Sequence, residues 1–204
     1  MLSKLILKCL VIITIMLHNI TNTYADKNSS LKKSMSNQSN HETAILAGGC
    51  FWGVEEIFRQ QSGVINTEVG YCGGTTSNPT YETVSTGLTG HAEAVKIIFD
   101  NQKISYEKIL KLFFAIHDPT QLNRQQNDIG TQYRSAIFYT NLSQKKVAED
   151  LIKKAQELKI YDDTIRTQIL PLTTFYPAEK YHQNYLKNNP HGYNCHYIRP
   201  QWQF

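Results

Sequence analysis

Apolar and polar residues alternate along this chain with two different periods, which predicts strands mixed with helices. The apolar run at residues 43–48 ends in two glycines, as a buried strand does, and Val54, Ile57 and Phe58 follow it at helical spacing. The further predicted elements are strands at 64–71 and 92–99, a helix at 105–117 and a strand at 136–140. The order βαββαβ predicts an α+β fold of the ferredoxin-like plait type, in which helices pack on one face of an antiparallel sheet.

The rest of the chain predicts additions to this core. We expect a helix at 143–159, a strand near 165–170 and a helix near 178–187. From Asn189 onward the chain is rich in Asn, Pro, Gly and aromatic residues, so we expect a long coiled C-terminal segment that covers the surface as a loop.

The first 42 residues differ in character from the others. Two lysines precede the apolar run at 10–17, which is shorter than the roughly 20 residues that a membrane span requires. The residues at 23–25 fit a signal peptidase site, so residues 1–25 predict a secretion signal, and a retained membrane anchor is the alternative. Residues 26–42 are rich in Ser, Asn and Lys and predict a flexible linker. We therefore expect an exported protein, periplasmic or secreted, whose folded domain spans residues 43–204.

The composition excludes several classes of protein. A chain of 204 residues with 41% hydrophobic residues can bury the core of one domain. Its 21 basic and 17 acidic residues give a net charge of +4 without a basic cluster, so nucleic acid is not an expected partner. His91 and Glu93 form the His-x-Glu of zinc deaminases, but the Cys-x-x-Cys that accompanies that motif is missing, as are Walker and dinucleotide-binding glycine patterns. We expect no bound metal or cofactor.

Cys50 lies at the predicted turn between the first strand and the first helix. Unpaired backbone N–H groups and the helix dipole favour an anion there, and such sites lower the pKa of a thiol from about 8.5 to between about 3.5 and 7.5. The thiolate is the reactive form, so Cys50 is a candidate nucleophile. A small buried side chain without a chemical role is the alternative, and position alone does not decide between the two.

Glu93 is a candidate proton donor. The alternation of its strand puts the carboxyl on the same side as Val95, Ile97 and Phe99. Desolvation disfavours the charged form, so the pKa of Glu93 should be raised. The alternative is a residue near the start of the strand whose side chain simply reaches solvent.

Three further residues are candidates for the same site. Phe51 and Trp52 follow Cys50 directly, and they either form an apolar wall beside its sulfur or pack in the core. Asp128 lies in the polar segment 127–134 before a strand, as residues of long functional loops often do. Neither observation assigns a role by itself.

Five segments resemble, in order and spacing, the family of A-type peptide methionine sulfoxide reductases, which reduce the S epimer of methionine sulfoxide. They are GCFWGVE at 49–55, GYCGG at 70–74, NPTYETV at 78–84 with GHAEAV at 90–95, the segment 128–135, and YHQNYL at 181–186. The resemblance covers residues 43–197, which is nearly all of the expected domain.

The resemblance implies a role for the two central candidates. Cys50 is implied to be the nucleophile and to end as a sulfenic acid, and Glu93 to be the acid that protonates the sulfoxide oxygen. This agrees with the chemistry, because sulfoxide sulfur is a poor electrophile until its oxygen is protonated and can depart as water. A nucleophilic sulfur and a protonated carboxyl must therefore coexist at one pH.

The resemblance also implies the surroundings of the reacting atoms. Phe51 and Trp52 are implied to form the pocket for the substrate methyl group. Tyr81 and Tyr133 are implied to hydrogen-bond the sulfoxide oxygen, and Asp128 to organise the site.

A second cysteine is implied to close the catalytic cycle. Cys195, in the C-terminal segment, would attack the Cys50 sulfenic acid and form a disulfide that a thioredoxin-type donor reduces. The family often places this cysteine directly after Gly-Tyr, whereas Asn194 intervenes here, and no later cysteine follows. Cys72 is the rival. We favour Cys195, because a loose segment reaches further than a strand end.

The expected protein is a monomeric enzyme that reduces methionine sulfoxide, free or in oxidised proteins. Export requires a membrane-linked, thioredoxin-like donor, because exported compartments keep dithiols oxidised. Two other functions fit the same residues. One is a thiol peroxidase or disulfide exchanger that uses Cys50 without Glu93, and the other is a binding module with a structural disulfide from Cys50 to Cys195 or Cys72.

Overall fold

A computed structural model describes residues 40–202 of the chain. The predicted leader at 1–25 and nearly all of the predicted linker at 26–42 lie outside the described residues. The strands are β1 (His41–Gly48), β2 (Val64–Cys72), β3 (Ala92–Asp100), β4 (Arg124–Gln125), β5 (Asp128–Ile129), β6 (Ser135–Tyr139), β7 (Gln168–Pro171) and β8 (Phe175–Pro177). The helices are α2 (Phe51–Arg59), α3 (Tyr81–Ser85), α4 (Tyr106–Ile116), η1 (Thr131–Tyr133), α5 (Leu142–Glu157), α6 (Tyr185–Asn188) and η2 (Pro200–Trp202). Between residues 40 and 202, no helix has the length and apolar character that crossing a membrane demands.

Six of the strands form one sheet in the order β7-β6-β1-β3-β2-β8. Its four inner strands, β6, β1, β3 and β2, are antiparallel, which is the strand order of the ferredoxin-like plait. β7 pairs parallel with β6, and β8 pairs antiparallel with β2. The α+β plait predicted from the sequence is therefore confirmed.

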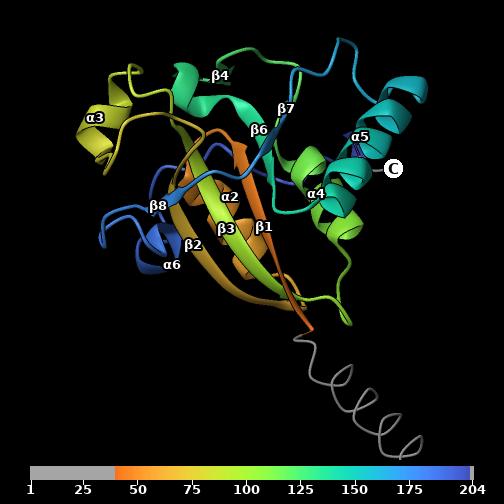
Figure 1. Cartoon of the computed structure of the whole chain (residues 1–204), viewed down its shortest axis with the longest axis horizontal. Helices are drawn as coiled ribbons and strands as arrows, with labels where there is room; N and C mark the ends of the chain where they lie inside the picture. The colour runs from red at the N-terminus through yellow and green to blue at the C-terminus, as the bar shows by residue number, and fades with distance from the viewer. Residues whose placement is uncertain (1–39, 203–204) are drawn as a thin grey trace, which may run out of the picture. The chain divides into compact units, whose positions relative to one another are not determined.

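The two faces of the sheet are covered differently. One face packs against α2, α4 and α5 and forms the main core, which holds Phe51, Phe58, Phe99 and Phe113. The other face is a smaller apolar layer. The chain between β7 and β8 crosses this face, in front of the sheet in Figure 1, while α2 lies behind it. α4 and α5 lie side by side at one edge.

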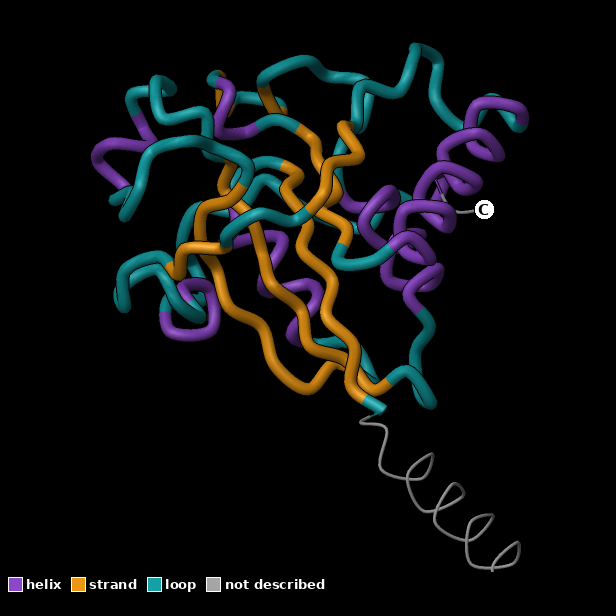
Figure 2. Tube along the Cα trace, viewed as in Figure 1, coloured by secondary structure: helices purple, strands orange, loops and turns teal. Residues whose placement is uncertain are grey.

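The long connections that carry the candidate residues gather at one end of the sheet. The segments 73–91 and 117–134 lie at the end where β1 finishes, and β1 starts at the opposite end (Figure 2). The tight turn from β1 into α2 lies at this same end, so the topology brings these segments together.

The predicted helix near 178–187 is wrong for most of its length. Only Tyr185–Asn188 is helical, and the preceding residues form turns. Gln183 explains the difference, because its side chain accepts a hydrogen bond from the Val69 amide and donates to the Val69 and Ala178 carbonyls. These bonds replace helical ones and tie the segment to β2. The C-terminal segment from Asn189 is irregular, as predicted, apart from η2.

Smaller differences arise where elements are short. β1 begins at His41, inside the segment predicted as linker, because His41 and Glu42 pair with Asp100 and Phe99 of β3. The short elements α3, β4, β5 and β8 carry too few residues for a hydrophobic period to show in the sequence.

Candidate active site

A cavity of about 100 Å³ lies at the end of the sheet where the long loops meet. The residues that line it are Cys50, Phe51, Trp52, Tyr81, Glu93, Asp128, Tyr133 and Tyr193. The structure thus brings together seven of the eight residues expected from the sequence, and the eighth, Cys195, lies against one of them. A larger hollow of about 280 Å³ beside α4 is lined by aliphatic and lysine side chains and holds neither a thiol nor an acid. The chemistry therefore points to the smaller cavity.

Cys50 is the N-cap residue of α2 and is buried. The Trp52 amide favours the thiolate, as expected for a helix start, but burial and the nearby Glu93 carboxyl act more strongly. Burial, followed by the charge of Glu93, raises the pKa of the Cys50 thiol well above its usual range. The expectation of a lowered pKa is wrong, because helix-end stabilisation does not offset desolvation of the sulfur. The substrate-free protein holds a neutral thiol.

Gly49 shapes the turn that presents Cys50. Its φ of +104° is a conformation that L side chains rarely adopt, and an added Cβ would lie 2.6 Å from Cβ of Gln125. Gln125 of β4 in turn bonds the backbone of Asp118 through both ends of its amide. A glycine is therefore required where the segment that carries Asp128 packs against the Cys50 turn.

Glu93 points into the main core face, as the alternation of its strand predicts. It is 3% exposed, and its Oε2 accepts a hydrogen bond from the Phe51 amide at 3.1 Å. Burial raises the pKa of Glu93 to about 8, although the Phe51 bond opposes the shift. The carboxyl is mostly protonated at neutral pH, and the alternative of a solvent-exposed strand end does not apply.

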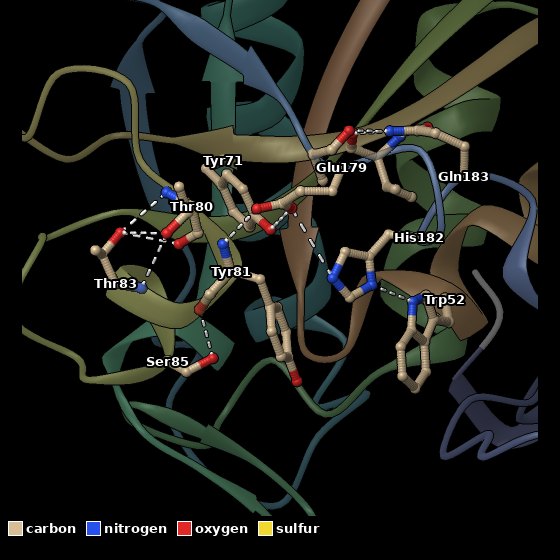
Figure 3. A network of polar contacts seen from close by, with 11 residues as sticks. Trp52, Tyr71, Thr80, Tyr81, Thr83, Ser85, Glu179, His182 and Gln183 are labelled. Carbon is tan, nitrogen blue, oxygen red and sulfur yellow. Dashed lines mark hydrogen bonds and ion pairs between the residues drawn. The ribbon is translucent and has the colours of Figure 1, made fainter.

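Aromatic side chains form one side of the cavity. Phe51 is buried and Trp52 is half-buried at the start of α2, with ring centroids 6.4 Å apart. Tyr81 begins α3, whose N-terminus is fixed by a capping box between Thr80 and Thr83. Burial raises the pKa of Tyr81, so its hydroxyl stays a hydrogen-bond donor. Figure 3 shows Tyr81 and Trp52 on either side of His182.

Asp128 joins the cavity to the C-terminal segment. Its Oδ1 accepts a hydrogen bond from the Tyr193 hydroxyl at 3.0 Å, and its Oδ2 accepts one from the Cys195 thiol at 3.3 Å. Tyr133, in η1, also lines the cavity, and burial together with the Glu93 charge raises its pKa. Asp128 thus accepts two hydrogen bonds from the C-terminal segment.

The three cysteines among the described residues are all free thiols, and they differ in position. Cys195 is half-buried, and burial with the charge of Asp128 raises its pKa to about 12. Cys72 is fully buried beside Ala92 on the smaller apolar face, whereas Tyr71 and Glu93 form a pair on the main core face. Opposite faces of the sheet therefore separate Cys72 from Glu93.

Sequence reasoning assigned no role to Tyr193, Glu179 and His182, which are all part of this region. Glu179 accepts hydrogen bonds from the Tyr81 amide and the Tyr71 hydroxyl, each at 2.8 Å (Figure 3). The sequence contained only one signal for these residues, the YHQNYL segment at 181–186, which includes His182. That segment does not indicate that His182 contacts Trp52 or Glu179. In the part of the chain from 40 to 202, no group of three or more His, Cys, Asp or Glu side chains is placed to hold a metal ion.

The family model and the relatives that match this chain all point to one family. A model of the family described as peptide methionine sulfoxide reductase matches residues 42–203. The peptide methionine sulfoxide reductase MsrA of Pasteurella multocida is 54% identical over 158 residues, which are 77% of this chain and 89% of that protein. The MsrA of Nautilia profundicola is 53% identical over 155 residues, 76% of this chain and 88% of that protein.

Solved structures also resemble this chain in fold. The reduced form of Mxr1 from Saccharomyces cerevisiae aligns with a TM-score of 0.73 at 35% identity, covering 80% of this chain and 94% of that one. Mxr1 in complex with Trx2 aligns with a TM-score of 0.53 at 23% identity, covering 80% and 93%, which is a likeness of fold.

The plait fold and the family match together define an α+β oxidoreductase, with a cysteine and a buried acid in one cavity. Given the family match over nearly the whole described region, the chain belongs to the peptide methionine sulfoxide reductase family.

Proposed function

We propose that this chain reduces the S epimer of methionine sulfoxide with Cys50 as nucleophile and Glu93 as acid. One observation carries the proposal: the Cys50 thiol and a protonated carboxyl line the same cavity, beside an aromatic wall of Phe51 and Trp52. The wall offers apolar contact to a methyl group, while the acid and the tyrosine hydroxyls offer donors to an oxygen. A methyl sulfoxide presents these two groups on one sulfur atom.

The raised pKa of both reacting groups fits the stoichiometry of the reaction. The departure of the sulfoxide oxygen as water requires two protons, and Glu93 and the Cys50 thiol each hold one at neutral pH. The Cys50 sulfur forms a bond to the sulfoxide sulfur as the S–O bond breaks. Water then attacks the Cys50 sulfur, which releases methionine and a proton and leaves a sulfenic acid. The substrate sulfur is reduced by two electrons and the Cys50 sulfur is oxidised by two.

Cys195 is the proposed resolving residue. Its thiol bonds Asp128, which lines the cavity together with Cys50, whereas Cys72 lies on the other face of the sheet. The Cys195 sulfur attacks the sulfenic acid, a disulfide forms, and the hydroxyl departs as water with the thiol proton.

A thioredoxin-type dithiol is the proposed electron donor. The yeast protein Mxr1 has been solved in complex with Trx2, and this chain shares its fold. The dithiol reduces the disulfide between Cys50 and Cys195 and is itself oxidised to a disulfide. We also propose that the protein is exported and acts as a monomer on free or protein-bound methionine sulfoxide. Export rests on the sequence of residues 1–25, which lie outside the described region.

The decisive experiment is the release of methionine by the purified protein with dithiothreitol and each sulfoxide epimer. We expect turnover of the S epimer and none of the R epimer. Cys50→Ser should abolish turnover, and Cys72→Ser is the matched control that should retain it. Full activity of Cys50→Ser, or reduction of the R epimer alone, would contradict the proposal.

A further inference from the structure

His182 lies behind the aromatic wall of the cavity without lining it. Its side chain is only 2% exposed, and its Nδ1 accepts a hydrogen bond from Nε1–H of Trp52 at 3.1 Å. The His182 ring also contacts Phe51 and Tyr81, with ring centroids 5.1 Å and 4.5 Å away. Figure 3 shows Tyr81 beside His182. This single ring therefore contacts residues of two separate elements, α2 and α3.

The Trp52 hydrogen bond assigns the proton on the His182 ring to Nε2, and Glu179 lies on that side of the ring. Because Nδ1 accepts the Trp52 N–H, the proton of the neutral imidazole is on Nε2. Nε2 is buried, makes no hydrogen bond within the described region, and lies 4.0 Å from Oε2 of Glu179. The carboxylate attracts the Nε2 proton, and the same carboxylate accepts the Tyr81 amide and the Tyr71 hydroxyl. The His182 acceptor thus stays directed at Trp52.

Trp52 packs against the main core and lies beside Phe51, and one hydrogen bond adds to these contacts. Its indole stacks on Tyr185 at 3.9 Å, and the bond to His182 is the only one of its indole N–H among the described contacts. Packing and stacking are contacts without strong directionality, whereas the hydrogen bond from Nε1 is directional and holds the Nε1 edge of the indole in one place. Without this bond, only packing and stacking hold the indole that lines the cavity.

We infer that His182 is a positioning residue that sets the size of the alkyl pocket, so that the site accepts a methyl sulfoxide and rejects larger alkyl sulfoxides. The inference rests on the proposed function, because it assigns the methyl group to the Trp52 wall. His182 acts through Trp52 and does not touch the substrate. When Trp52 is held in one orientation, the pocket has no room for an added methylene. When Trp52 can shift, the pocket can accept that methylene.

The test compares S-methionine sulfoxide with S-ethionine sulfoxide, which differ by one methylene. His182→Leu removes the acceptor, His182→Gln keeps one, and His191→Leu changes an exposed histidine as a control. We expect the ratio of kcat/KM for methyl over ethyl to fall about tenfold in His182→Leu, which is the discrimination that one methylene carries in an apolar pocket. His182→Gln should stay close to the wild-type ratio, and His191→Leu should match it.

A second readout does not depend on catalysis. The chain has two tryptophans, so Trp202→Phe leaves Trp52 as the only indole emitter. In that background His182→Leu should shift the Trp52 emission and raise its mobility, and His182→Gln should not. If His182→Leu does not fold, His182→Met replaces it with a side chain of similar volume and no strong acceptor.

An unchanged methyl-to-ethyl ratio together with unchanged Trp52 emission in the Leu or Met variant would overturn the inference. Equal loss of selectivity in Gln and Leu variants of native helical content would overturn it too, because the acceptor would then be irrelevant. A wild-type protein that reduces neither sulfoxide would instead refute the proposed function, and the emission data would still decide whether His182 holds Trp52.

Discussion

The backbone amide of Phe51 donates a hydrogen bond to Oε2 of Glu93 across 3.1 Å, although 42 residues separate the two in the chain. The bond holds the carboxyl against the first turn of α2, directly beside Cys50. A helix start offers a free amide there, and the strand alternation of β3 directs the carboxyl to it. This contact joins the proposed acid, Glu93, to the residue that follows the proposed nucleophile, Cys50.

Replacing Glu93 by Gln should lower kcat/KM at pH 7 by about 100- to 10,000-fold, the usual range for a general acid. The wild-type rate should be flat below pH 8 and fall as pH rises through about 8, because the protonated carboxyl is the active form and its pKa is about 8. The Gln variant should lack this decline. Initial rates measured from pH 5 to 10 check both points.

Glu55→Gln is the matched control for this variant. Glu55 is also buried on α2 with a raised pKa, but it bonds Thr67 and the Asn184 amide and does not line the cavity. Glu55→Gln should keep the wild-type decline of the rate near pH 8. A Glu93→Gln enzyme that keeps the wild-type decline near pH 8 would show that another group is the acid.

Glu93→Gln should also make the folded protein more stable than the wild type at high pH. The folded-state pKa of Glu93 is about 8, and the ordinary value is 4.5, so the folded protein holds this proton more tightly than the unfolded chain. The wild type therefore loses stability relative to Glu93→Gln as pH rises from 4.5 to about 8, by a few kcal/mol in total. Urea unfolding at pH 5 and pH 8.5 measures the difference. A gap that does not widen between these pH values would contradict a buried, neutral Glu93.

Tyr81→Phe and Tyr133→Phe should each lower kcat/KM by about tenfold or more, because each hydroxyl is a donor to the developing charge on the sulfoxide oxygen. Both hydroxyls stay protonated, since burial raises the pKa of each. Tyr106→Phe is the control, because the Tyr106 hydroxyl is buried on α4 and makes no hydrogen bond to any residue between 40 and 202. Steady-state kinetics of the three variants suffice. Losses that Tyr106→Phe reproduces would indicate a general effect on folding.

Cys195→Ser should release one methionine per enzyme and then stop when thioredoxin is the donor, because no disulfide with Cys50 can form. Cys72→Ser should continue to turn over, since Cys72 lies on the opposite face of the sheet. Rapid-quench measurement of methionine per enzyme distinguishes the two. The reverse pattern would make Cys72 the resolving residue.

Gly53→Ala should slow the second half of the cycle and spare the first. An added Cβ would overlap the Asn194 side chain and lie 2.7 Å from Nδ1 of His196, so the segment that carries Cys195 must move. Alanine also suits a helix better than glycine, so α2 itself should not suffer. We expect disulfide formation to slow by about tenfold or more, an effect of roughly 1.4 kcal/mol or more on the barrier. Methionine release in a single turnover should be unchanged, and a slower first turnover would contradict this account.

The sequence by itself determined the core of this fold and predicted the groups that react. Hydrophobic periods predicted the six elements of the plait, because each strand or helix buries one face and its period follows from local geometry. The alternation of β3 also determined that Glu93 faces the core. The clustering of Cys50, Glu93 and Tyr81 followed from motif resemblance and could not be obtained from any period.

Only the tertiary structure decided the rest. The pKa of Cys50 depends on how far burial outweighs the helix start, and this balance is set by packing from distant segments. The contacts of His182 with Trp52 and of Cys195 with Asp128 join residues that are far apart in the chain. The helix expected near 178–187 failed for the same reason, since the Gln183 side chain bonds a strand instead of leaving the backbone to form its own helix. Local patterns determine which face of an element is buried, whereas long-range contacts determine what it is buried against.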